Sequence, residues 1–149
     1  MNLEMNYLDR TELVKDAAPG TYDEYSDVQL DGLITRASML MRRYTKSALY
    51  AVDEYGMPTN QRIRDAFRDA TSAQVLAWVQ AELVGELFTD GATSEASVAS
   101  SSNNGSSVTF DTSVATAART RLLSGDLADG ARLILEDAGL IGVQPWIRV

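Results

Sequence analysis

The chain of 149 residues is 45% hydrophobic and 23% charged, which is enough for one hydrophobic core, so we expect a single domain over residues 1–149. Because it contains neither Cys nor His, disulfides, thiolate metal ligands and the usual acid–base group near neutral pH are excluded, and we expect no enzyme, cofactor or metal site. A net charge of −8 opposes binding to nucleic acid, and no run reaches the roughly 20 apolar residues of a membrane span.

Two helices are predicted in the first third of the chain. Asp9 and Glu12 have the spacing of a capping box, so a short helix begins at Asp9, and Pro19 ends it. Ser26 is an N-cap type of residue, and the second helix should run from there to about Thr45. Its apolar face recurs at helical spacing and comprises Leu30, Leu33, Ile34, Ala37, Leu40, Met41 and Tyr44.

A connection without regular structure should follow the second helix. Residues 49–55 alternate loosely between apolar and polar types and include β-forming residues. Gly56 and Pro58 then interrupt the pattern. We expect a short irregular or extended segment here.

The longest helix should begin at a cap formed by Thr59 or Asn60 and reach about Phe88. One of its faces is apolar throughout and comprises Ile63, Phe67, Ala70, Ala77, Trp78, Ala81, Val84 and Phe88. The opposite face is polar at first and later becomes apolar at Val75, Leu76, Val79, Leu83 and Leu87. A helix that is apolar on two faces must be covered on both, either by helices of the same chain or by a neighbouring subunit.

A Ser-rich segment covers about residues 92–110. Seven of the fourteen residues from Ser94 to Ser107 are Ser, so the segment buries too little to offset its ordering entropy. It is either a flexible loop or a β-hairpin that orders against a partner. Asn104 and Gly105 favour the hairpin, because this dipeptide suits a type I′ turn. The sparse strand residues would be Val98, Val108 and Phe110.

Two further helices are predicted before an apolar tail. The fourth helix should be capped by one of residues 111–113, run through Leu123 and end at Gly125. Asp126 should cap a last short helix, and Gly139 followed by Leu140 is typical of a Schellman motif at its end. The apolar side of this last helix would comprise Leu127, Ala131, Leu133, Ile134 and Ala138.

The C-terminal tail, about residues 141–149, is apolar. A solvated tail seldom carries a residue such as Trp146, and termini are mostly disordered unless they dock. We therefore expect the tail to lie in a groove, which could belong to its own subunit or to another one.

No pattern of residues indicates a reaction. The chain lacks the spacing of an EF-hand, of a P-loop and of a dinucleotide-binding turn. The acidic group Asp23, Glu24 and Asp27 complements the dipole of the second helix better than it makes a cation site. Two basic clusters remain, and a salt-bridged surface is favoured over an interface for both. They are Arg42, Arg43 and Lys46, and Arg62, Arg64 and Arg68.

The serial order of these elements resembles the small head-to-tail connector proteins of long-tailed bacteriophages, also called adaptor or head-completion proteins. The residues that carry the resemblance are the runs 33–38, 42–45, 73–77, 107–110, 131–135 and 138–140. The resemblance implies a mainly α fold. It would be a small bundle of four to five helices with a long central helix, a Ser-rich β-hairpin or loop, and an extended C-terminal tail.

The resemblance also implies a structural role in the virion neck, between capsid and tail, after assembly in the host cytoplasm. Copies of the chain would form a ring, commonly of twelve, that binds the portal protein and offers a docking surface to a tail-side neck or stopper protein. Genomic DNA would pass through the channel without sequence-specific binding, and no membrane would be involved. The portal-docking candidates are Pro145, Trp146, Ile147 and Val149, and the hairpin-tip candidates are Asn104 and Gly105. The candidate subunit interface is Val75, Val79, Leu83 and Leu87.

The main alternative is a small helical DNA-binding regulator. In that case Arg62, Arg64 and Arg68 would face the phosphates of a duplex. The acidic net charge and the lack of a basic recognition helix oppose this alternative. An enzyme that uses only carboxylates is a third possibility, but no spacing of residues identifies one.

Overall fold

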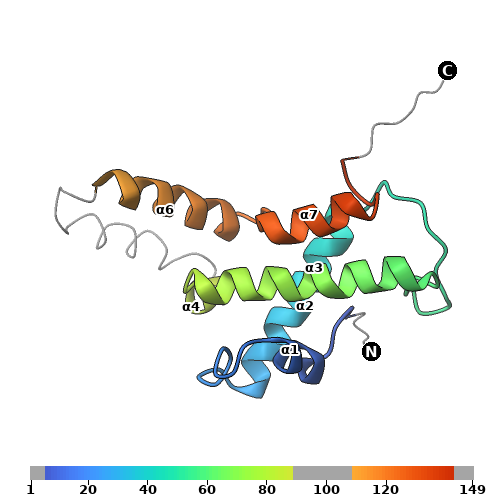
Figure 1. The fold of residues 1–149 in the computed structure, drawn as a ribbon, viewed down its shortest axis with the longest axis horizontal. Helices are drawn as coiled ribbons and strands as arrows, with labels where there is room; N and C mark the ends of the chain where they lie inside the picture. The colour runs from blue at the N-terminus through green and yellow to red at the C-terminus, as the bar shows by residue number, and fades with distance from the viewer. Residues whose placement is uncertain (1–5, 89–108, 143–149) are drawn as a thin grey trace. The chain divides into compact units, whose positions relative to one another are not determined.

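The computed structural model describes residues 6–88 and 109–142, with side chains from residue 116 onward in the second range. The described residues are mainly helical, which confirms the predicted fold class (Figure 1). The helices are α1 (Arg10–Asp16), α2 (Asp27–Tyr44), α3 (Gln61–Gln80), α4 (Val84–Leu87), α6 (Thr109–Leu123) and α7 (Asp129–Asp137).

Contacts within the chain divide it into two compact units. The first unit comprises the described parts of Met1–Val75 and Ala128–Val149, and the second comprises those of Leu76–Leu127. Helices α1, α2 and α7 therefore belong to the first unit, whereas α4 and α6 belong to the second. Helix α3 begins in the first unit and ends in the second.

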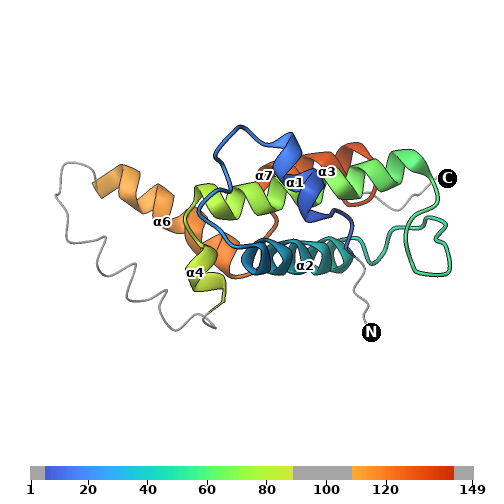
Figure 2. The same cartoon turned by 90° about the horizontal axis from the view of Figure 1, so that it is seen from below.

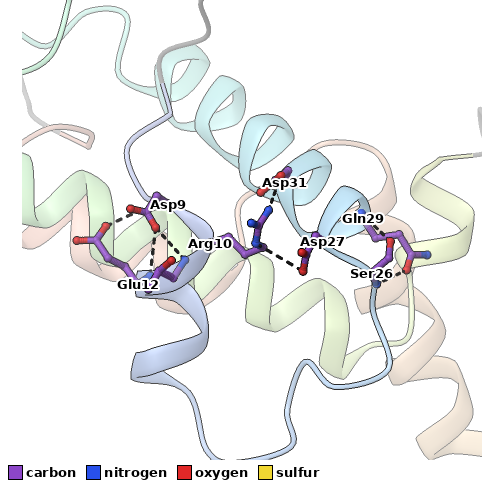
Figure 3. Close-up of polar contacts among 8 residues, drawn as sticks. Asp9, Arg10, Glu12, Ser26, Asp27, Gln29 and Asp31 are labelled. Atoms are coloured by element: carbon purple, nitrogen blue, oxygen red, sulfur yellow. Dashed lines mark hydrogen bonds and ion pairs between the residues drawn. The ribbon is translucent and has the colours of Figure 1, made fainter.

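The predicted N-terminal caps of α1 and α2 are confirmed (Figure 3). The Asp9 carboxylate accepts from the backbone N–H groups of Thr11 at 2.8 Å and Glu12 at 3.3 Å, and Glu12 accepts from the N–H of Asp9 at 3.3 Å. Ser26 and Gln29 exchange the same pair of bonds at 3.1 and 2.9 Å. These reciprocal bonds satisfy N–H groups that a helix start leaves without partners, and so fix where α1 and α2 begin.

Helices α1 and α2 are joined on the surface by Arg10 (Figure 3). Its Nη1 lies 2.7 Å from a carboxylate oxygen of Asp31, and its Nε lies 3.6 Å from Asp27. All three side chains are more than a third exposed, so these pairs contribute little to stability. Their effect is to orient α1 relative to the start of α2.

The core of the first unit is built on the predicted face of α2. Six of the seven expected residues are buried, and Tyr44 is half-buried. Phe67 of α3 is fully buried, and the ring of Tyr7 stacks on it with centroids 4.4 Å apart. Leu13 of α1 and Leu135 of α7 are also buried. The apolar stripe read from the α2 sequence therefore does face a core.

The third helix is shorter than predicted, because α3 ends at Gln80 and does not continue to Phe88. Glu82 follows in a left-handed conformation with a φ of 59°. The N–H of Leu83 donates to the carbonyl of Trp78 at 3.0 Å, and the N–H of Glu82 donates to that of Val79 at 3.0 Å. These two bonds form a Schellman motif, which stops a helix. The motif was not predicted because its left-handed position is usually Gly.

A charged contact in the second unit lies beside this helix end. The Arg119 guanidinium of α6 donates to the carbonyl oxygen of Ala81 and to both carboxylate oxygens of Glu86 in α4, the latter at 2.9 and 3.1 Å. The Glu86 side chain is only 11% exposed. Arg119 thus satisfies a carbonyl that the end of α3 leaves open and holds α4 and α6 together.

Two predictions about α7 are wrong. Asp126 does not cap this helix, since its carboxylate pairs with Arg121 at 3.3 Å. The N-cap is Ala128, and its backbone N–H donates to the side-chain oxygen of the buried Gln74 at 2.8 Å. Leu133, expected on the apolar side, is 67% exposed.

The C-terminal boundary of α7 is as predicted. Gly139 has a φ of 77°, and the N–H of Leu140 donates to the carbonyl of Leu135 at 2.9 Å. The N–H of Gly139 donates to the carbonyl of Glu136 at 3.0 Å, which completes a Schellman motif.

The Ser-rich segment differs from expectation at its end. Helix α6 begins at Thr109, so Phe110 is helical and cannot be a strand residue of a hairpin. The expected caps at residues 111–113 lie inside α6 for the same reason. Asn104 and Gly105 lie outside the described residues.

Candidate assembly surfaces

The predicted subunit interface on the third helix is largely internal. Val75 and Leu83 have no exposed surface, Leu87 is 7% exposed and Val79 is half-buried. The sequence predicts an interface here because a second apolar face needs a cover, which a neighbouring subunit could supply. Since the chain itself already covers Val75, Leu83 and Leu87, that reason is removed, and we correct the assignment for these three residues.

The structure does not describe the other residues that the sequence predicts to contact partners. Pro145, Trp146, Ile147 and Val149 of the tail lie outside the described residues, as do Asn104 and Gly105 of the expected hairpin. The last described residue is Gly142, which adopts a φ of 69°. A Cβ added to Gly142 would lie 3.6 Å from the side chain of Glu136, so the described part of the chain ends beside α7.

An exposed apolar turn joins α2 and α3, where an irregular connection was predicted. Leu49 is 97% exposed, Tyr55 is 74% exposed and Val52 is 49% exposed. Single exposed apolar side chains are common. Three within seven residues, however, expose apolar area whose burial against a partner is energetically favourable. The alternation of these residues in the sequence predicts an irregular connection but does not indicate that the turn is a surface.

A network of hydrogen bonds organises the exposed turn. The Asp53 carboxylate accepts from the backbone N–H groups of Tyr55 at 2.8 Å and Met57 at 3.0 Å. An isolated antiparallel bridge pairs Val52 with Pro58, and Gly56 supplies a φ of 87°. The turn is therefore ordered by hydrogen bonds within itself, so little conformational entropy remains to be lost when a partner binds.

The basic clusters are engaged with other groups of the chain. Arg62 donates to the backbone carbonyl of Asp137 at 3.3 Å. Arg68 lies 3.1 Å from the carboxylate of Asp69 and 3.9 Å from that of Asp65, and the hydrogen bond with Asp69 raises the pKa of Arg68. In the other cluster, the guanidinium groups of Arg42 and Arg43 lie over the rings of Tyr7 and Tyr44 at 5.7 and 5.6 Å. These contacts support the interpretation as a paired surface.

A polar hollow of about 420 Å³ lies in the first unit, between the N-terminal segment, α2 and α3. Both carboxylates and guanidinium groups line it. Its charged lining residues are Asp9, Arg10, Glu12, Asp31, Arg64, Asp65 and Arg68. Because these charges nearly cancel and several are paired with each other, the hollow has no preference for an anion or a cation.

A second, more apolar groove of about 560 Å³ is lined by residues of α3 and α7, all of which belong to the first unit. The two helices lie side by side (Figure 1 and Figure 2). Its apolar residues are Ala66, Leu133, Ile134 and Ala138. Its charged residues are Arg62, Asp65, Asp69 and Asp137. The unexpected exposure of Leu133 places an apolar side chain on the rim of this groove.

Neither a metal site nor a membrane-spanning helix is found among the described residues, and comparison with known proteins gives no match. The described part of the chain holds no group of three or more Asp or Glu side chains arranged to bind a metal ion. None of the described helices combines the length and apolar character that crossing a membrane requires. No family model, curated protein or solved structure matches the chain.

Proposed function

We propose that the chain is a structural subunit of a bacteriophage neck. In this proposal, copies of the chain form a ring that binds the portal protein, extends the DNA channel and offers a docking surface to a tail-side protein. The proposal includes the finer features of the connector fold, namely a helical bundle, a Ser-rich hairpin or loop before α6, and an extended tail.

The exposed turn between α2 and α3 is the observation that carries this proposal. It presents Leu49, Val52 and Tyr55 to solvent on a hydrogen-bonded backbone. A preordered turn with a large aromatic residue suits a protein–protein interface, in which rigid apolar side chains fill a pocket of the partner. With the predicted interface corrected, this turn is a candidate contact between the subunit and the portal.

The charge of the chain supports a channel function. A net charge of −8 makes the average surface repel phosphate. Among the Arg residues of α3 that could oppose this, Arg68 is paired with carboxylates and Arg62 donates to a backbone carbonyl. A ring of such subunits would let DNA slide through without gripping it.

The same contacts weigh against the DNA-binding regulator. Arg62 and Arg68 are engaged within the chain, and Arg64 lies beside the carboxylates of the polar hollow. A titration of duplex DNA at low salt distinguishes the two functions. Tight binding that weakens steeply with added salt would favour the regulator, and no binding is expected of the neck subunit.

The exposed turn gives a direct test of the proposed function. The double variant Leu49→Asp with Tyr55→Asp should keep its helical circular dichroism, because both side chains are exposed, yet lose binding to the portal ring encoded in the same genome. Sedimentation of the mixture measures this binding.

The matched control is Val28→Asp with Met39→Asp, which places the same two charges on α2 side chains that are 80% and 57% exposed and lie outside the turn. This variant should bind the portal ring as the unaltered chain does. Portal binding that survives the double substitution in the turn would remove the observation on which the proposal rests.

A further inference from the structure

The tail begins within reach of the groove between α3 and α7. Gly142 lies beside Glu136 of α7, and Glu136 is only about 4.5 Å along the helix axis from Leu133 on the groove rim. Residues 143–149 can extend over at most about 25 Å. The groove is therefore accessible to the tail of its own chain, over a short tether.

The groove offers apolar contact and excess negative charge. Ala66 forms a nearly buried part of its lining, and Leu133 stands exposed at its edge. Three carboxylates and one guanidinium group surround these apolar residues. Because Arg62 already donates to the Asp137 carbonyl across the groove, the cation is held in place while the Asp137 side chain still faces solvent.

The composition of the tail complements this groove. Residues 143–149 include the apolar side chains of Val143, Trp146, Ile147 and Val149, and their one charged side chain is Arg148. An aromatic or aliphatic residue can cover Leu133 and Ala66, while Arg148 can approach the exposed side chain of Asp137. Apolar contact supplies the affinity, and the opposite charges supply the orientation.

We propose that the tail, residues 143–149, binds in the groove between α3 and α7 of its own chain when the subunit is free. A short tether gives the tail an effective concentration of roughly millimolar, so even a weak site fills from within the chain before a second copy at micromolar concentration can compete. This is why we assign the groove to the chain's own tail.

One consequence rests on the proposed function. If the tail contacts the portal in the virion, the groove holds it until the portal displaces it, and the groove is then open to another partner. The docking itself concerns the isolated chain, so its test is independent of whether the portal is the partner.

The absence of Cys from the chain makes disulfide trapping a clean test. The pair Leu133→Cys with Ile147→Cys, and the pair Leu133→Cys with Trp146→Cys, are made in the full chain and oxidised slowly. Leu133 is 67% exposed, so its substitution should not disturb the core. We expect at least one of the two pairs to form an intramolecular disulfide about tenfold faster than its control.

The control replaces the groove position with Glu136→Cys and keeps the same tail position. Glu136 is exposed on α7 and lies closer to the start of the tail, so an undocked tail would reach it at least as readily as position 133. Equal or slower trapping at position 133 for both tail positions would overturn the proposal. So would disulfides that link two chains, because they would assign the groove to the tail of another copy.

The charge contribution can be tested in the same assay. Adding Arg148→Glu to the faster pair should slow intramolecular trapping by about two- to fivefold, as expected for a partly exposed charge pair. Arg148→Lys keeps the charge and should leave the rate nearly unchanged. A rate that Arg148→Glu does not lower would contradict the assigned role of the groove carboxylates.

Discussion

At the scale of single residues, the most consequential backbone conformation is that of Glu82. A left-handed residue with a side chain is strained relative to Gly, yet Glu82 ends α3 and lets the chain turn into α4. The strain is tolerated because Leu83 and Trp78, which flank the turn, are both buried and hydrogen-bonded through their backbones. The burial of these two side chains and the backbone hydrogen bonds of the motif thus offset the missing Gly.

The substitution Glu82→Gly should stabilise the protein by about 1 kcal/mol, because Gly adopts this left-handed conformation without strain. This value is the net effect, since Gly also makes the unfolded chain more flexible, which opposes folding. Urea unfolding followed by circular dichroism measures the change. Gly139→Ala is the matched control, since Gly139 has a φ of 77° and no atom within 4 Å of an added Cβ. It should destabilise by about the same amount, whereas a neutral or destabilising Glu82→Gly would contradict the strain.

Two buried tyrosines make stability sensitive to alkaline pH. Burial raises the pKa of Tyr7 to about 12, and the neighbouring Tyr50 adds to the shift while Arg42 opposes it. Burial raises the pKa of Tyr22 to about 12 as well. In the unfolded chain both groups should ionise near the ordinary value of 10.0. The folded state therefore binds more protons than the unfolded state above that pH.

The free energy of unfolding should be insensitive to these groups below pH of about 10 and should fall between about 10 and 12. Denaturant midpoints measured across this range test the expectation. Tyr7→Phe keeps the stacking on Phe67 and removes one ionising group, so the decline should become shallower. If the free energy of unfolding of Tyr7→Phe declined as steeply as that of the unaltered chain, the ionisation of Tyr7 would not contribute to the alkaline loss of stability.

At the scale of elements, Arg119 is the polar link between α6, α4 and the end of α3. Its partners are a carbonyl oxygen and a carboxylate that is mostly buried. Arg119→Met keeps much of the apolar stem but removes the charge, which leaves both partners without this donor. We expect a loss of about 2 kcal/mol of stability.

Hydrogen exchange of the amides in residues 84–87 measures this loss locally. Arg121→Met is the control on the same helix, because its pair with Asp126 is about half exposed and should contribute under about 1 kcal/mol. Similar effects of the two substitutions would contradict the structural importance of the Arg119 contact.

The start of each early helix could be predicted because its signal is local. The capping boxes at Asp9 and Ser26 lie within four consecutive residues, and the Gly139–Leu140 stop likewise needs only neighbours in the chain. The N-cap of α7 could not be predicted, since its acceptor comes from Gln74, fifty-four positions earlier. The end of α3 was missed because Glu82 carries no sequence signal for a left-handed turn.

Burial was harder to predict than helix position. Periodicity identifies an apolar face but does not say what covers it, so Val75 and Leu83 were assigned outward although the chain buries them. The opposite error concerns Leu133, because the helical periodicity predicts that it is buried whereas it is exposed. The exposed turn at residues 49–55 was described as irregular, which its conformation supports, but its role as a surface depends on exposures that the sequence does not contain.

At the scale of the whole molecule, the proposed neck subunit needs surfaces that are available for assembly. Its core must also stay folded when partners bind to those surfaces. The exposed turn and the groove between α3 and α7 both belong to the first unit and share no residue. Two separate surfaces on one subunit permit head-to-tail contacts, and such contacts close into a ring when the rotation between neighbours allows it. Among the described residues, these two surfaces are therefore our candidates for assembly contacts.

Mass measurement of the complex with the portal tests the central claim most directly. The purified chain is mixed with the portal ring encoded in the same genome, and the assembly is weighed by native mass spectrometry. The account predicts a closed complex with one copy of the chain for each portal subunit. A portal ring that remains bare in the presence of excess folded chain would contradict it.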